Sequence, residues 1–74
     1  MNKDYEKRIG ERLRLLREER KLTQEEVSAR LQILGCDITR SALAKIEVGQ
    51  RHIYADEIKL MAEIFKVSCD DILL

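Results

Sequence analysis

Two oppositely charged residues, Arg17 and Glu47, occupy positions where helical patterns in the chain are otherwise apolar. An apolar stripe at helical spacing runs from Ile9 to Leu16, and Arg17 falls on the same face. Glu47 lies one helical turn after Leu43, on the apolar face of a later pattern. Because a charge that faces a core is costly unless an opposite charge compensates it, we predict that Arg17 and Glu47 form an ion pair where two helices meet.

Residues for catalysis or metal binding are sparse. The chain has one histidine, His52, and two separated cysteines, Cys36 and Cys69, whereas metal sites need closely spaced ligands. The adjacent acids Glu25-Glu26 and Asp70-Asp71 fit helix starts, where carboxylates suit the helix dipole. We therefore expect no enzyme, no catalytic residues, no metal and no cofactor, with both cysteines reduced.

Length and composition favour one small folded unit. The chain has 74 residues, of which 45% are hydrophobic and 38% charged, and it contains no proline. These values are typical of a compact helical domain with a thin core, here expected over residues 1–74. No apolar stretch is long enough to cross a membrane, and the N-terminus lacks the apolar segment of a signal peptide, so we expect a cytoplasmic protein with no membrane partner.

The formal net charge is zero, but the charges are unevenly distributed. Residues 1–22 carry eight basic and five acidic groups (+3), and residues 39–54 carry three and one (+2). Residues 23–38 have a net charge of −2 and residues 55–74 a net charge of −3, which balance these positive charges. This distribution permits one basic face, so a nucleic-acid partner is not excluded by the net charge.

Start and stop signals divide the chain into five expected helices. The first runs from about Tyr5 to Arg20 with Asp4 as its N-cap. Thr23-Gln-Glu-Glu26 is a capping box for a second helix, which is expected to bury Val27, Leu31 and Leu34 and to end at Gly35.

The remaining helices have equally clear signals. Thr39 begins a helix that runs to Val48 and ends at Gly49. A fourth helix spans about Ala55 to Phe65, and Ser68 caps a last turn that ends in Ile72-Leu73-Leu74. No strand-like alternation of useful length occurs, so the predicted fold class is all-α with five helices.

With these elements in place, the chain resembles the Cro/cI-type (lambda-repressor-like) helix-turn-helix family. The matching stretches are Ile9–Arg17, Lys21–Val27, Thr39–Glu47 with Gly49, and Val67–Leu73. The resemblance implies a compact five-helix DNA-binding domain whose helix-turn-helix lies at helices 2 and 3, about residues 23–48. In the family, the residues that match Arg17 and Glu47 form a buried salt bridge.

The connection between helices 2 and 3 departs from the family pattern. Leu31 lies eight positions before Thr39, a longer spacing than the family usually has. Because Ile33, Leu34 and Ile38 give the extra residues an apolar side, we expect a longer second helix rather than a loop.

Family positions also assign contacts with DNA. The expected base readers are Arg40, Ser41, Ala44 and Lys45, and the expected backbone contacts are Gln24, Thr39, Arg51 and His52. Arginine can bind guanine O6 and N7 in a bidentate manner, lysine can bind guanine or phosphate, and alanine can contact a thymine methyl. The alternatives are a solvated helix face for Arg40 and Lys45, an ordinary capping-box glutamine for Gln24, and a polar loop for Arg51 and His52.

The expected function is that of a sequence-specific transcriptional regulator of bacterial or phage type. It would act as a repressor that binds double-stranded DNA at a palindromic operator as a homodimer. Ile72-Leu73-Leu74 would form the dimer contact, and the alternative is that Ile72 and Leu73 finish the core while Leu74 frays. The rival hypothesis is a protein–protein adaptor or antitoxin with the same fold. The two hypotheses differ in whether Arg40, Lys45 and Arg51 share an exposed face without intervening carboxylates.

Overall fold

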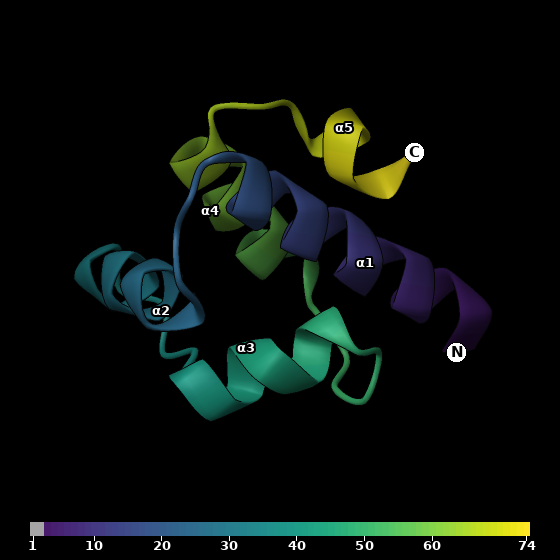
Figure 1. The fold of residues 1–74 in the computed structure, drawn as a ribbon, viewed down its shortest axis with the longest axis horizontal. Coiled ribbons are helices and arrows are strands. Elements are labelled where there is room, and N and C mark those ends of the chain that lie inside the picture. Colours follow the sequence, from purple (N-terminus) through teal and green to yellow (C-terminus); the bar gives the residue numbers. More distant parts are fainter. Residues whose placement is uncertain (1–2) are drawn as a thin grey trace.

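The computed structural model describes residues 3–74, and within that range the fold is all-α with five helices. The helices are α1 (Lys3–Glu19), α2 (Gln24–Ile33), α3 (Arg40–Glu47), α4 (Ala55–Phe65) and α5 (Cys69–Leu73). Figure 1 shows α1 running across the molecule, with α3 on one side of it and α5 on the other. The predicted fold class is therefore confirmed. Among the described helices, none is both long and apolar enough to cross a membrane.

The first helix begins earlier than predicted. Asp4 lies inside the first turn of α1, together with Glu6, so its prediction as the N-cap is wrong. A carboxylate in the first turn still interacts favourably with the positive end of the helix dipole, which explains an acidic residue at this place without a capping role. The apolar stripe itself is correctly predicted, because Ile9, Leu13 and Leu16 are buried.

The capping box of α2 is present as predicted. The Thr23 side chain accepts a hydrogen bond from the Glu26 amide at 3.0 Å, and the Glu26 carboxylate accepts one from the Thr23 amide at 2.9 Å. The hydrogen bond that the Glu26 carboxylate accepts from the Thr23 amide lowers the pKa of Glu26. On the core side of α2, Val27 and Leu31 are fully buried.

The second helix continues past Leu31 and ends just before Gly35, as predicted, so it takes up part of the extra length. The helix α2 ends at Ile33, and Gly35 follows with φ of +85°, a conformation that glycine adopts without a steric penalty. Ile33 is 84% exposed and Leu34 46% exposed, so the prediction that Leu34 faces the core is wrong. Gly35 therefore ends α2 where the sequence predicts, but the last apolar residues of the helix lie outside the core.

The rest of the connection is held against the core as ordered, non-helical chain. Ile38 is fully buried, and its carbonyl accepts a hydrogen bond of 2.7 Å from the Ser28 hydroxyl. The Cys36 amide donates to the Leu31 carbonyl at 2.8 Å, which satisfies an acceptor at the end of α2. These contacts fix where Thr39, and with it α3, begins.

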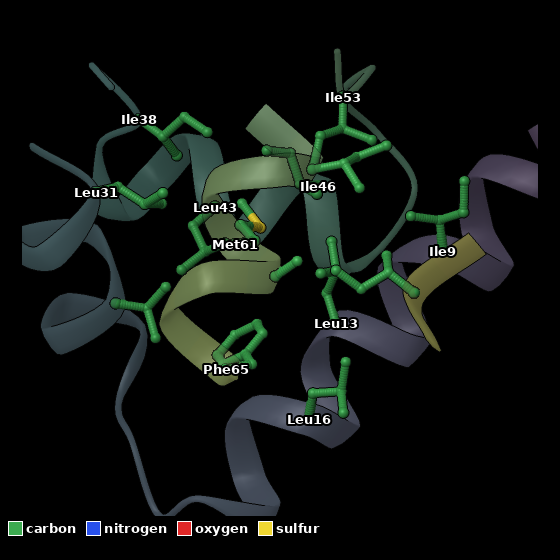
Figure 2. Packing of buried hydrophobic residues seen from close by; sticks show 14 of the residues in the cluster. Ile9, Leu13, Leu16, Leu31, Ile38, Leu43, Ile46, Ile53, Met61 and Phe65 are labelled. Atoms are coloured by element: carbon green, nitrogen blue, oxygen red, sulfur yellow. The ribbon is translucent and has the colours of Figure 1, made fainter. Parts of the chain in front are cut away.

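All five helices contribute to the core. Figure 2 shows Leu13 of α1, Leu43 and Ile46 of α3 and Met61 of α4 converging on it. Each of these four side chains is at most 1% exposed. The bounds of α4 match the prediction, and its four expected core residues, Ile58, Met61, Ala62 and Phe65, are all buried.

The short helix α5 is fastened to α1. Its start is capped as predicted, because the Ser68 side chain accepts a hydrogen bond from the Asp71 amide. Arg12 donates from Nε to the Asp71 carbonyl at 2.7 Å, and the Tyr5 hydroxyl donates to the Leu73 carbonyl at 3.2 Å. Because the last carbonyls of a helix lack partners within it, α1 supplies donors that α5 needs.

Candidate nucleic-acid interface

The helix α3 has two separate faces. Leu43, Ile46 and Glu47 point inward and are buried. The Thr39 hydroxyl begins the helix by accepting a hydrogen bond from the Ala42 amide at 3.2 Å. The residues at the spacing of the outward face are Arg40, Ser41, Ala44, Lys45 and Val48, all exposed except the half-buried Ala44. The expected base readers therefore lie together on the solvent side of α3.

Val48 belongs to this outward face although the sequence analysis did not assign it. It follows α3 as the C-cap and is 53% exposed. It comes four positions after Ala44, one helical turn further along the same side. That spacing is the sequence signal that could have identified it.

The outward face of α3 has basic but no acidic groups. Over the described residues of α3, the only carboxylate belongs to Glu47, which is buried, and the first turn has none. Arg40 and Lys45 are both exposed. Arg40 and Lys45 therefore share an exposed face without intervening carboxylates, which is the condition that distinguishes a DNA-binding protein from an adaptor of the same fold.

Glu47 is the centre of a hydrogen-bonded ion pair. Arg17 Nε lies 2.7 Å from Glu47 Oε2, and Arg17 Nη2 lies 3.1 Å from Glu47 Oε1. The side chains are 12% and 3% exposed, and Arg17 Nη1 also donates to the Leu22 carbonyl at 2.8 Å. The hydrogen bond with Glu47 raises the pKa of Arg17. The structure thus contains the ion pair that the apolar spacing predicts between the first and third helices.

Gln24, at the first position of α2, completes this arrangement. Its side-chain amide donates to Glu47 Oε1 at 3.0 Å. One carboxylate therefore binds α1 through Arg17 and α2 through Gln24, and so fixes both helices relative to α3. The side-chain nitrogen of Gln24 serves this contact, which the sequence analysis did not foresee.

A close crossing of α1 and α3 lies beside the ion pair. A Cβ atom added to Gly10 would come within 2.2 Å of the Ile46 carbonyl oxygen and 2.8 Å of that of Glu47. Only a residue without a side chain permits this approach of two backbones. Gly10 therefore sets how deeply the end of α3 sits against α1.

Arg51 and His52 differ from the basic residues of α3, because each lies beside a carboxylate. Arg51 Nη1 and Nη2 lie 3.2 and 3.3 Å from the two oxygens of Glu57, and His52 Nδ1 lies 3.4 Å from Glu6 Oε2. The hydrogen bond with Glu57 raises the pKa of Arg51. Burial opposes ionisation of Glu57, but hydrogen bonds from Arg51 and from the Tyr54 amide outweigh it and lower the pKa of Glu57. Arg51 therefore does not meet the condition that Arg40 and Lys45 meet.

An open cleft borders α3 on the side of α1 and α2. Its walls come from the end of α1 and the turn after it, from the start of α2 and from α3. The lining residues are Arg14, Arg17, Lys21, Leu22, Thr23, Gln24, Glu25, Arg40, Glu47 and Val48. Two candidates of the sequence analysis, Gln24 and Arg40, thus line the same hollow.

Comparison with known proteins agrees with this geometry. The sequence profile of the helix-turn-helix family matches residues 13–72. The chain belongs to the Cro/cI-type helix-turn-helix family. The fold of this helix-turn-helix chain is similar to that in the crystal structure of the DNA-binding domain of BldD, with a TM-score of 0.83 over 100% of both chains at 20% sequence identity. No curated protein matches the sequence.

Helices α2 and α3 form the helix-turn-helix. In this chain their connection is the ordered segment that Ile38 anchors in the core. Within the described residues, no cluster of three or more His, Cys, Asp or Glu side chains is arranged to hold a metal, and Cys36 and Cys69 are not bonded to each other. The chemistry that the site offers is that of hydrogen-bond donors, positive charge and small apolar contacts.

Proposed function

We propose that the protein is a cytoplasmic, sequence-specific DNA-binding transcriptional regulator that places α3 in the major groove. The observation that carries this proposal is the outward face of α3, where Arg40 and Lys45 are exposed and the helix's one carboxylate is buried. A surface of that kind suits DNA, because its cations attract the phosphates, which repel carboxylates, and its donors match base acceptors such as guanine O6 and N7. Family membership and the fold shared with a DNA-binding domain support the same conclusion.

The outward residues divide the reading of bases among them. Arg40, at the start of α3, donates to guanine O6 and N7, and Ser41 adds a short polar contact. Lys45 contacts guanine or a phosphate. Ala44 and Val48 contact thymine methyls, because neither has a polar side chain and both lie on the same side of the helix.

The backbone contacts come from positions at the ends of helices. Gln24 and Thr39 stand at the starts of α2 and α3, where main-chain amides point outward. Arg51 and His52 follow α3 and contact the phosphates on its other end. Because Glu57 already binds Arg51, we expect this arginine to contribute less to affinity than Arg40 does.

A selection from random duplexes at two salt concentrations tests the proposal. We expect a preferred sequence, and we expect Arg40→Ala to weaken binding to it by about 1–3 kcal/mol while relaxing one base position. Arg30→Ala is the matched control, since Arg30 is an exposed arginine on α2 outside the cleft. A parent chain that enriches no sequence contradicts the proposal and favours the adaptor or antitoxin hypothesis.

The finer proposal is a repressor that binds a palindromic operator as a homodimer. One recognition helix covers few base pairs, and two copies about one DNA turn apart, roughly 34 Å, provide the needed specificity. Ile72 is buried and serves the core, so the contact falls to the groove between α1 and α5, where Leu15, Leu73 and Leu74 lie. Because α5 lies across α1 from α3, a contact there leaves α3 uncovered (Figure 1).

Sedimentation at micromolar concentration, with and without operator, tests the dimer. We expect a dimer on the operator and its loss in the Leu73→Ser, Leu74→Ser double variant, because Leu74 is 87% exposed and water covers it in the monomer. Ile33→Ser provides the control, since Ile33 is equally exposed at the end of α2. A monomer under both conditions, or a dimer that the double variant leaves intact, removes this interface.

A further inference from the structure

The cleft beside α3 contains three basic side chains that are not used to build the fold. Arg14 is on α1, Lys21 is in the turn that follows, and Arg40 is at the start of α3, and all three are exposed. They come from three segments of the chain and meet around one hollow. The fourth basic residue of the cleft, Arg17, is already bound to Glu47.

The carboxylates of the same cleft do not cancel these charges. Glu47 is buried and takes its hydrogen bonds from Arg17 and Gln24. Glu25 is the other carboxylate that lines the cleft, so the exposed groups are three cations and one anion. Arg14 also contacts Glu18 at 3.4 Å, but both side chains are about half exposed, and water and salt screen such a pair.

Lys21 follows the end of α1 in a left-handed backbone conformation, which is common directly after a helix. Its φ is +55°, in the left-handed region where glycine is favoured and a lysine carries strain. Lys66, which ends α4, has the same conformation with φ of +59°. Lys66 lines a different hollow, together with Ile64 and Phe65. The chain thus contains two lysines of matched conformation, of which one borders α3.

We propose that this cleft seats one phosphate of the DNA backbone beside α3, and that Lys21 and Arg14 are the cations that bind it. The proposal rests on the proposed function, because it requires α3 to lie in the major groove. A helix in the major groove has a phosphate backbone along each of its sides. On one side of α3, that backbone would lie against the cleft. Ammonium and guanidinium groups donate to phosphate oxygens through charge-assisted hydrogen bonds.

The two lysines with the same backbone conformation, Lys21 and Lys66, allow a controlled test of the phosphate contact. Lys21→Gly and Lys66→Gly each remove one positive charge and relax one left-handed residue, so both variants keep the fold. With the preferred duplex as probe, we expect Lys21→Gly to bind roughly fivefold to tenfold more weakly at about 0.1 M salt, with a salt slope that is less steep by about 0.9. Lys66→Gly should match the parent in both quantities.

A second pair of variants examines Arg14. We expect Arg14→Gln to reduce the salt slope as Lys21→Gly does, and Arg30→Gln to leave it unchanged. The preferred base sequence should stay the same in all four variants, since phosphate contacts carry no base information.

The outcomes separate this inference from the proposed function. If the parent chain binds the duplex and the Lys21→Gly and Arg14→Gln variants equal it in affinity and salt slope, the proposed phosphate site is wrong but the proposed function stands. A parent chain that binds no duplex overturns the proposed function and the phosphate site together. If one of these variants loses the preference for a base at one position of the duplex, the substituted residue reads that base, and the proposed phosphate site is also wrong.

Discussion

The start of α3 differs from the starts of α2, α4 and α5. Those three helices each have two carboxylates in the first turn: Glu25 and Glu26, Asp56 and Glu57, and Asp70 and Asp71. The first turn of α3 has none, and its first residue is Arg40. A positive charge at the positive end of a helix dipole is unfavourable, so α3 forgoes a stabilising device that its neighbours use.

The difference indicates what holds each helix in place. The helix α3 is short, and its inward residues Leu43 and Ile46 and the bound Glu47 fix it to the core from one side. That anchorage leaves its first turn available for another purpose. Departures from local stability rules are expected at functional sites, and Arg40 is such a departure.

The largest expected effect comes from breaking the anchorage of α3. We expect Arg17→Ala or Glu47→Ala to lower the free energy of unfolding by on the order of 3 kcal/mol, because each leaves a charge buried without its partner. The Arg17→Met, Glu47→Leu double variant should recover much of this loss. Urea denaturation measures all three, and strictly additive losses would show that the pair does not couple the helices.

A smaller loss is expected where α1 crosses the end of α3. Gly10→Ala should cost about 2–3 kcal/mol, because its Cβ meets carbonyl oxygens that belong to the backbone and cannot rotate away. Gly35→Ala is the control, with open space around it and a cost of about 1 kcal/mol from its positive φ alone. Equal losses in thermal or urea melts would mean that the crossing is loose enough to open.

The third prediction reverses the charges of two helix starts. Arg40→Glu should raise the free energy of unfolding by about 0.5 kcal/mol, and Glu25→Arg should lower it by a similar amount, because each changes the sign of a charge in a first turn. On the proposed function, Arg40→Glu also abolishes binding to the preferred duplex. Shifts of the same sign in the two variants would contradict the comparison between these helices.

The smallest effect concerns the start of α4 and depends on pH. The folded-state pKa of Glu57 lies below its ordinary value of 4.5, so its contacts add stability above that pH and lose it as the pH falls through the folded-state pKa. Glu57→Gln should therefore flatten the acid side of the stability curve, whereas Glu63→Gln, at an exposed position of the same helix, should not. Urea melts between pH 6 and pH 3 measure this, a range of about 1.5 units on either side of the ordinary value. Parallel curves for Glu57→Gln and the parent would exclude the effect.

Much of the fold was predictable because its signals are local. Thr23 with Glu26, the spacing of Leu43 and Ile46, and Ser68 each define a helix start or a buried face within a few residues. The pairing of Arg17 with Glu47 was also predictable, because each charge lies on an apolar helix face and a buried charge needs an opposite charge beside it.

The wrong predictions and the unforeseen contacts concern places where tertiary structure decides. The spacing of Leu34 after Leu31 predicted a buried side chain, but Leu34 is 46% exposed and the core contains Ile38 of the following segment instead. The binding of Arg51 by Glu57 joins the loop after α3 to α4, and no periodic pattern relates the two residues. Gly10 is similar, because the carbonyls that it approaches lie on another helix.

The separation of α3 into two faces has a consequence for how this chain can change. The residues that hold the helix in the core, Leu43, Ile46 and Glu47, are distinct from those that face outward. Substitutions at Arg40, Ser41 or Lys45 should alter the free energy of unfolding by no more than about 0.5–1 kcal/mol, the range that is typical of surface substitutions and helix-dipole effects. A library randomised at these positions should therefore consist mainly of folded proteins, and on the proposed function its members should differ in the DNA sequence that they prefer.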